Sequence, residues 1–300
     1  TAIEKSIVEE KFALINSTLF KFKLAKFPDG KAGIILNVHH IIADSWSLGL
    51  TIQEIIKIYH DLKKDNQEYI CDTFSYKNLI QSEKDYKNSN RYINDKEFWN
   101  TYLQNFSEPV SIPSIKKSTY ANNSQAKRLS FDVENTLVKQ ISEFCNLHKI
   151  SNYSFFMSIF SLYIANVSNV SDLIIGTPIL NRLNYKDKLT TGMFVTTMPF
   201  RVSFESNDTF VNYALKNNVN LVSIFRHQRY PYSDILEDMR KNTDIPNLYD
   251  IAISYQITKA VSNEIGNYET NWTFNNNSLN DINIHLYDIN DTGNEKYSED

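Results

Sequence analysis

The sequence predicts a mixed α/β fold in which strand-like segments are separated by helix-like segments. Residues 17–40 contain two strand-like runs on either side of a Pro-Asp-Gly turn signal at 28–30. Residues 47–63 carry apolar side chains at spacings of three and four, which is the period of an amphipathic helix. Strand-like and helix-like segments follow one another again from residue 125 to the end of the chain. We therefore expect mixed sheets flanked by helices.

The first two strands are expected at residues 17–27 and 32–40. The first alternates Lys with Phe and Leu, whereas the second is apolar almost throughout, as in a strand buried on both faces. A hairpin of these two strands would place His39 and His40 together at its far end. The amphipathic helix 47–63 would begin shortly after them.

Two further helices are expected at 75–89 and 91–105, and the pattern then breaks. Residues 109–124 contain two prolines and several Ser and Asn, with no helical or strand-like period. We interpret this segment as a linker between an N-terminal lobe, residues 1–108, and a C-terminal lobe, residues 125–300.

The second lobe begins with a strand expected at 126–132 and a helix that runs to residue 149. A very apolar helix follows, for which Ser151 has the residue type and position of an N-cap. The remaining expected elements are strands at 172–179 and 193–204, helices at 208–227 and 231–240, and strands near 248–257, 267–274 and 282–289.

Composition excludes few classes of function. The chain has 300 residues and a net charge of −4, so no basic surplus indicates a nucleic-acid or anionic-membrane partner. Cys71 and Cys145 are too few for a disulfide framework and fit no metal-ligand spacing. No apolar run approaches the ~20 residues of a membrane-spanning helix. We expect a cytoplasmic protein with reduced thiols, and a chain that is part of a longer polypeptide.

His39 and His40 are the first candidates for chemistry, and Asp44 follows four residues after the second of them. Neighbouring strand residues point to opposite faces, so one imidazole could face a cleft and the other the interior. Divergent imidazoles and the lack of a third suitably spaced ligand disfavour a metal site. Asp44 could be a helix N-cap, a charge partner or the orienting carboxylate of a triad. Ser45 and Ser47 raise the idea of a serine nucleophile, but no G-x-S-x-G turn is present.

The H-H-x-x-x-D spacing at 39–44, followed by Trp46-Ser47, resembles the H-H-x-x-x-D-G-W-S motif of nonribosomal peptide synthetase condensation domains. Those domains belong to a wider group of acyltransferases similar to chloramphenicol acetyltransferase. Ser45 departs from the motif, because the family has Gly there.

Other segments resemble the same family in the same order along the chain. The segment 74–81 matches poorly, and Thr196 stands where the family has Asn. The closer matches are Gly176-Thr177-Pro178, Asn181-Arg182, Gly192-Met193-Phe194-Val195, Pro199-Phe200-Arg201, residues 227–236 and the strand-like segments 246–256 and 284–288.

The resemblance implies two lobes, each similar to chloramphenicol acetyltransferase, that form a V with an acyl-transfer tunnel between them. The family's opening motifs are missing before Thr1, and its last helices and strands have no counterpart. The chain would therefore be a condensation domain truncated at both ends. The implied reaction transfers a donor acyl or peptidyl group from one carrier-protein thioester to the amine of an aminoacyl thioester on a second carrier.

The resemblance also implies roles for individual residues. His40 would be the general base or would position the amine, because imidazole can accept a proton near neutral pH. His39 would point inward and be structural. Asp44 would form an ion pair with Arg182 that joins motifs of the two lobes. Ser45 keeps a backbone N–H that could face the oxyanion.

No metal and no cofactor of the domain itself are implied, since both substrates would arrive on the 4'-phosphopantetheine arms of carrier proteins. The implied partners are donor and acceptor carrier proteins and a neighbouring adenylation domain. Three alternatives stay open: an epimerisation domain, a coenzyme A-dependent acyltransferase of the same fold, and a non-catalytic docking module, for which Ser45 and the truncation speak.

Overall fold

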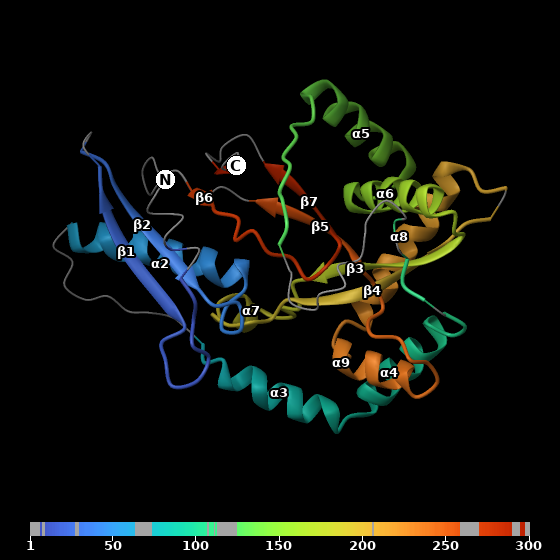
Figure 1. Cartoon of the computed structure of the whole chain (residues 1–300), viewed down its shortest axis with the longest axis horizontal. Coiled ribbons are helices and arrows are strands. Elements are labelled where there is room, and N and C mark those ends of the chain that lie inside the picture. Colours follow the sequence, from blue (N-terminus) through green and yellow to red (C-terminus); the bar gives the residue numbers. More distant parts are fainter. Residues whose placement is uncertain are drawn as a thin grey trace.

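The fold combines mixed β-sheets with flanking helices, as the sequence predicts (Figure 1). The computed structural model describes residues 7, 10–27, 30–63, 74–106, 108–110, 112, 125–205, 207–258, 270–289 and 295–297.

The N-terminal part contains a two-stranded antiparallel hairpin of β1 (Phe20–Lys26) and β2 (Ala32–Val38). Its register pairs Phe20 with Val38 and Lys26 with Ala32. Both strands form, but β2 ends at Val38, two residues before the expected end at residue 40. Both histidines therefore lie beyond the strand. The expectation that the second strand is buried on both faces is wrong, because none of its residues is fully buried and Ile34 is 46% exposed.

Three helices continue the chain from the end of the hairpin. They are α2 (Ser45–Lys63), α3 (Lys77–Lys87) and α4 (Asn90–Tyr102). The side chain of Ser89 caps α4 by accepting a hydrogen bond from the Tyr92 N–H, at 3.3 Å. In Figure 1, α3 runs from the region of the hairpin and α2 toward α4 and α9, so it bridges the two parts of the molecule.

A four-stranded sheet in the order β4-β3-β5-β7 lies at the centre of the C-terminal part (Figure 1). The pair β3–β4 is antiparallel, whereas β3–β5 and β5–β7 are parallel, so the sheet is mixed. Its strands are β3 (Asp172–Ile179), β4 (Thr196–Ser203), β5 (Ile251–Thr258) and β7 (Ile282–Ile289).

Helices cover this sheet, and α6 is the most apolar of them. Ser151 caps α6 as predicted, because its Oγ accepts a hydrogen bond from the Ser154 N–H at 3.1 Å. The hydroxyl of Tyr153 at the start of α6 reaches the Ile253 carbonyl of β5 at 3.0 Å, which fixes the helix on the sheet. The remaining elements are α5 (Asn135–His148), α6 (Asn152–Ser168), α7 (Tyr185–Lys188), α8 (Phe210–Arg226), α9 (Tyr232–Arg240), β6 (Thr270–Trp272) and β8 (Glu295–Tyr297).

The strand expected at 126–132 is wrong: the segment is irregular, and an isolated bridge between Gln125 and Asn277 lies just before it. Leu129 and Phe131 are 80% and 84% exposed, so the large apolar side chains of this segment face solvent. Of the expected strand 267–274, the structure has β6, and residues 267–269 lie outside the described part. Most of the expected linker 109–124 and Cys71 also lie outside it.

The main core joins both parts of the chain. Trp99 and Leu103 of the α4 region are 1% and 0% exposed and belong to the same cluster as Phe200 of β4 and Ile253 of β5. The Trp99 indole N–H also donates to the carbonyl of His227, at 3.0 Å. By packing, α4 therefore contributes to the core of the C-terminal sheet, although it precedes the predicted boundary at residue 108.

Candidate functional site

A tight turn connects β2 to α2 and carries both histidines. The His39 N–H donates to the carbonyl of Leu19 at 2.8 Å, and the His39 carbonyl accepts from the Ile42 N–H at 3.1 Å. The expectation that both histidines lie on a strand is therefore wrong. A turn, and not the alternation of a strand, sets the direction of each ring.

The two rings nevertheless differ in accessibility. His39 is half-buried, and its Nδ1 accepts a hydrogen bond from the Ile41 N–H at 3.1 Å. Its ring also meets the ring of Phe12 edge-on, with 5.8 Å between centroids. His40 is exposed. Of the two imidazoles, that of His40 is therefore the more accessible.

Asp44 ends the turn and is buried, with 1% of its surface exposed. Its carbonyl accepts from the Leu48 N–H at 3.0 Å, and its Oδ1 accepts from the Ser47 N–H at 2.8 Å. That second bond is the N-cap interaction that the sequence allows. The carboxylate therefore fixes the first turn of α2.

The same carboxylate forms an ion pair with Arg182, as expected from the sequence. The Arg182 Nη2 lies 2.9 Å from Oδ1 and 3.1 Å from Oδ2, and neither side chain is exposed. The guanidinium carbon also lies 4.0 Å from the centroid of the Phe194 ring, a cation–π contact. Two further Arg182 hydrogen bonds, to the carbonyls of Asp187 and Thr190, hold the loop around α7.

Backbone donors of the segment leading into β4 complete the surroundings of Asp44. Its Oδ2 accepts from the N–H groups of Phe194 and Val195, at 3.0 and 3.3 Å. Burial alone raises the pKa of this carboxyl, but the hydrogen bonds from Ser47 and Phe194 and the charge of Arg182 outweigh it and lower the pKa below its ordinary value. Asp44 is therefore held as a buried carboxylate anion at neutral pH.

Ser47 belongs to the site as a hydrogen-bonding partner, a role that was not predicted from the sequence. It is 1% exposed, and its Oγ lies 2.7 Å from Asp44 Oδ1, 2.7 Å from the Gly192 carbonyl, 2.8 Å from Arg182 Nη2 and 2.9 Å from the Gly192 N. A hydroxyl donates one hydrogen bond and accepts two, so one proton serves either Asp44 or the Gly192 carbonyl. The Trp-Ser ending of the motif was the signal in the sequence that pointed to this position.

Tyr76 is a second residue that was missed as part of the site. It lies just before α3, and its hydroxyl donates to the Met193 carbonyl at 2.7 Å. A Cβ placed on Gly192 would lie 2.1 Å from the Tyr76 ring, so only Gly fits under that ring. Tyr76 belongs to the segment 74–81, which resembles the family only poorly.

Ser45 is the first residue of α2 and is exposed, with its backbone N–H at the open end of the helix. Its neighbour Trp46 is 40% exposed and donates its indole N–H to the carbonyl of Lys188 at 2.9 Å. An exposed imidazole therefore lies on a short turn beside a helix N-terminus, and a buried ion pair holds the end of that turn. This arrangement can accept a proton and stabilise developing negative charge.

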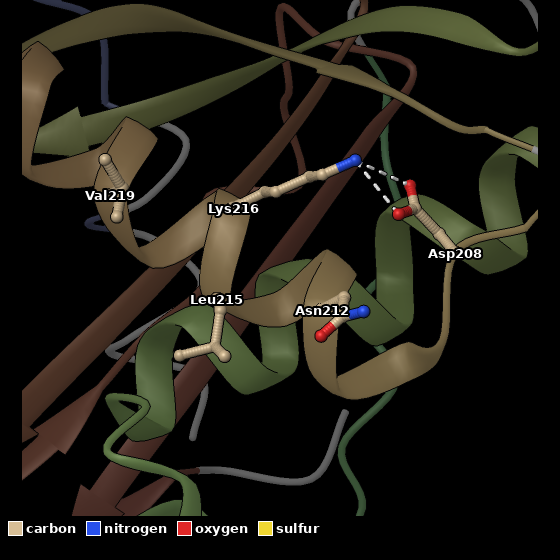
Figure 2. A pocket seen from close by; sticks show the side chains of 5 residues that line it. All are labelled: Asp208, Asn212, Leu215, Lys216 and Val219. Carbon is tan, nitrogen blue, oxygen red and sulfur yellow. Dashed lines mark hydrogen bonds and ion pairs between the residues drawn. The ribbon is translucent and has the colours of Figure 1, made fainter.

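Other features of the described residues add no second candidate site. Among them, no three His, Cys, Asp or Glu side chains are grouped as a metal would require, and no helix is long and apolar enough to cross a membrane. A hollow on the outer side of α8 is lined by Asp208, Asn212, Leu215, Lys216 and Val219 (Figure 2). Lys216 and Asp208 are paired across it at 2.9 Å. None of the residues of the histidine turn lines this hollow.

Comparison with known proteins identifies the family. The model of the condensation domain family matches residues 1–298. The chain is 32% identical to surfactin synthase subunit 1 of Bacillus subtilis (strain 168) over 93% of its length, and it spans 8% of that protein. It is 23% identical to bacitracin synthase 3 of Bacillus licheniformis over 85% of its length, and it spans 4% of that protein.

Solved structures agree in fold. The starter condensation domain of rhizomide synthetase RzmA, solved with C8-CoA, has a TM-score of 0.73 at 19% identity, over 85% of this chain and 57% of that one. The condensation domain of the Monacolin K polyketide synthase MokA has a TM-score of 0.69 at 14% identity, over 87% and 61% of the two chains. With a family match over nearly its whole length, the chain belongs to the condensation domains of nonribosomal peptide synthetases.

Proposed function

We propose that this chain forms an amide bond between two carrier-bound substrates. The amine of an aminoacyl thioester attacks the carbonyl of a donor acyl or peptidyl thioester. A tetrahedral intermediate forms, and it collapses to the amide and the free thiol of the donor arm. A primary amine is itself a good nucleophile, so this reaction requires alignment of the two ends and one group that manages the proton.

The exposure of His40 is the observation that carries the proposal. Of the three polar groups of the motif, Asp44 is buried in an ion pair, and His39 is half-buried with its Nδ1 accepting a hydrogen bond from the Ile41 N–H. His40 alone of the three is exposed. We assign to it the removal of the proton from the attacking nitrogen, or the hydrogen bond that positions that nitrogen.

The scaffold roles follow from the contacts around it. His39, Asp44 and Arg182 hold the turn and the adjoining loop and take no part in the chemistry. Ser45 occupies the helix start beside His40, where its backbone N–H is suited to a developing oxyanion. The side chain of Ser45 is exposed and lies outside the buried ion-pair cluster, which supports retention of activity despite the missing Gly.

Partners are part of the proposed function. Both substrates would be carried on 4'-phosphopantetheine arms, and the domain would bind no metal or cofactor of its own. Donor and acceptor carrier proteins would deliver them in the cytoplasm, with an adenylation domain of the same synthetase to load the acceptor. The likeness to surfactin and bacitracin synthases supports this context.

An acyl-transfer assay separates the proposal from its alternatives. The protein at its full natural length is incubated with a loaded donor carrier and a loaded acceptor carrier, and amide product on the acceptor arm is followed by mass spectrometry. The proposal expects product that depends on both carriers. Equal product from an acyl-coenzyme A donor without a donor carrier would support the coenzyme A-dependent acyltransferase. Inversion of the acceptor's Cα without amide product would support the epimerase, and binding of carriers without any conversion would support the docking module.

A further inference from the structure

We infer that the outer side of α8 is a self-association surface, through which two copies of this chain pair with their α8 helices antiparallel. The pairing is independent of the proposed amide-forming reaction. Three observations carry it: an apolar stripe on the outer side of α8, the spacing of the residues in that stripe, and opposite charges at the two ends of the helix.

The outer side of α8 is apolar where a surface helix is normally polar. Leu215, Val219 and Val222 are 37%, 69% and 44% exposed and form the outer stripe. The residues that α8 buries lie on the opposite side of the helix, and they are Tyr213, Ala214, Asn217, Leu221 and Ile224. Since a helix that is apolar on both sides is normally covered on both, the outer stripe is suited to a protein partner.

The spacing of the outer stripe is that of a helix packed against another helix. Steps of four and three residues alternate along the chain from just before α8 to its last residue, as the a and d positions of a coiled coil do, through Asp208, Asn212, Leu215, Val219, Val222 and Arg226. The first four of these residues also line the hollow on α8 (Figure 2). The hollow therefore offers space for side chains of an approaching helix.

The two ends of α8 carry opposite charges. At the N-terminal end, the Lys216 ammonium lies 3.2 Å from a Glu205 oxygen and 2.9 Å from an Asp208 oxygen, so two carboxylates share one cation and one negative charge is in excess. At the C-terminal end, Arg226 is exposed, and Arg91 donates to its carbonyl at 3.0 Å. Two such helices attract each other when antiparallel and repel each other at both ends when parallel.

Charge and spacing select the same register for two copies. A twofold axis that passes between Leu215 and Val219 makes the surface complementary to itself, as a symmetric dimer requires. In that register the facing pairs are Leu215 with Val219, Asn212 with Val222, and Asp208 with Arg226. Each Arg226 thus meets the acidic end of the other copy, and the polar Asn212 within the seam favours one register over its neighbours.

Sedimentation velocity of the protein at its full natural length tests the surface. Because the seam is short, we expect a dimer with a Kd on the order of 10–100 µM. Val219→Lys places a charge in the middle of the seam and should raise the Kd at least about tenfold. The matched control is Leu147→Lys in the last turn of α5, where Leu147 is 76% exposed, and it should leave the Kd unchanged.

Two outcomes of this experiment would contradict the inference. One is a wild type that stays monomeric at concentrations about tenfold above the expected Kd. The other is an equal Kd for Val219→Lys and Leu147→Lys, which would place any dimer contact on another face of the molecule.

A charge exchange tests the antiparallel register. Glu205→Arg makes both ends of α8 basic and Arg226→Glu makes both acidic, so each variant alone should dimerise at least about tenfold more weakly than wild type. An equal mixture of the two should dimerise as tightly as wild type, because each end then meets its opposite charge. Damage to the fold of either variant would not be repaired by mixing. A mixture no tighter than the separate variants would overturn the proposed pairing.

Discussion

Asp44 combines two tasks that are usually given to separate residues. One oxygen caps α2 through the Ser47 N–H, and both oxygens bind Arg182 from a segment far along the chain. A buried carboxylate is costly unless all its lone pairs are used, and the N–H groups of Phe194 and Val195 use those that remain. The residue therefore ties a helix start, a loop and a strand end to one point.

The first prediction concerns this carboxylate. Asp44→Ala leaves the Arg182 charge buried without its partner, which should lower the free energy of unfolding by about 3–5 kcal/mol. The matched control is Asp172→Ala, which removes the exposed partner of Arg201 and should cost about 1 kcal/mol or less. Urea denaturation of the three proteins measures both values. Full stability of Asp44→Ala would show that the ion pair does not hold the site together.

Ser47 carries the second prediction. Without its hydroxyl, both the N–H and the carbonyl of Gly192 lose this partner in a buried place, and Ser47→Ala should cost about 1–3 kcal/mol of stability. Ser45→Ala, two residues earlier and exposed, should change stability by about 0.5 kcal/mol or less. Denaturant midpoints compare the two, and equal effects at both positions would contradict the assignment.

At the scale of elements, α3 is fixed against the site by the residue that precedes it. The Tyr76 ring lies directly on Gly192, and its hydroxyl donates to the Met193 carbonyl. At the other end of the helix, Tyr86 donates to Asp95 of α4 at 2.6 Å. Because both ends are tied, a displacement of Tyr76 has to move the helix or break one of these contacts.

The third prediction follows from that contact. Gly192→Ala should be destabilising, because its Cβ would lie 2.1 Å from the Tyr76 ring. Adding Tyr76→Ala should remove the clash, so the double variant should be less destabilised than the sum of the two single changes. As a control, Gly49→Ala lies within α2, where the added Cβ meets no described atom within 4 Å, and should be neutral or stabilising. Additive effects in the double-mutant cycle would rule out this contact as the cause.

Most elements could be predicted because their signals are local. The cap at Ser151 and the apolar spacing of α2 are properties of a few neighbouring residues, and both match the structure. The prediction of a strand at 126–132 was wrong because the residues of a segment do not show whether a partner strand lies beside it. The strand expected to end at His40 ends two residues earlier, at Val38, because an apolar run does not show where a turn begins.

The candidate site likewise contains contacts that could be predicted and contacts that could not. The Asp44–Arg182 pair could be expected only from the family motifs, since the residues are 138 positions apart. Ser47 and Tyr76 were not assigned because their roles depend on the loop at Gly192, which is 145 residues from Ser47. A local sequence pattern does not reveal contacts between residues so far apart in the chain.

At the scale of the whole molecule, the site and the core both join the two parts of the chain. Asp44 and Ser47 from the N-terminal part meet Arg182 and Gly192 from the C-terminal part. The α4 residue Trp99 enters the core of the C-terminal sheet. A change in the fold of either part should therefore alter the position of the turn that carries His39 and His40.

The fourth prediction concerns alkaline pH. Burial raises the pKa of Tyr153 to about 12, and burial together with a hydrogen bond to Asp288 raises the pKa of Tyr255 to about 12. A phenol whose pKa is higher in the folded state stabilises the fold fully below its ordinary pKa of ~10 and loses that contribution as pH rises through the folded value. Stability should therefore fall between about pH 10 and 12.

Unfolding free energies measured from about pH 8 to 12 test this, with Tyr153→Phe as the variant and Tyr163→Phe as the control on the same helix, where the ring is 63% exposed. Tyr153→Phe should show a shallower alkaline decline than wild type, whereas the control should decline as wild type does. Parallel curves for all three proteins would contradict the role of the buried phenol.

The most direct test of the account is the rate of amide formation by His40→Ala with loaded donor and acceptor carriers. We predict a rate about 10²–10⁴-fold below wild type, the range for removing a general base. The melting temperature should be unchanged, because His40 is exposed. His148→Ala, in the last turn of α5, should keep the wild-type rate. An undiminished rate in His40→Ala would contradict the assignment of the reaction to this turn.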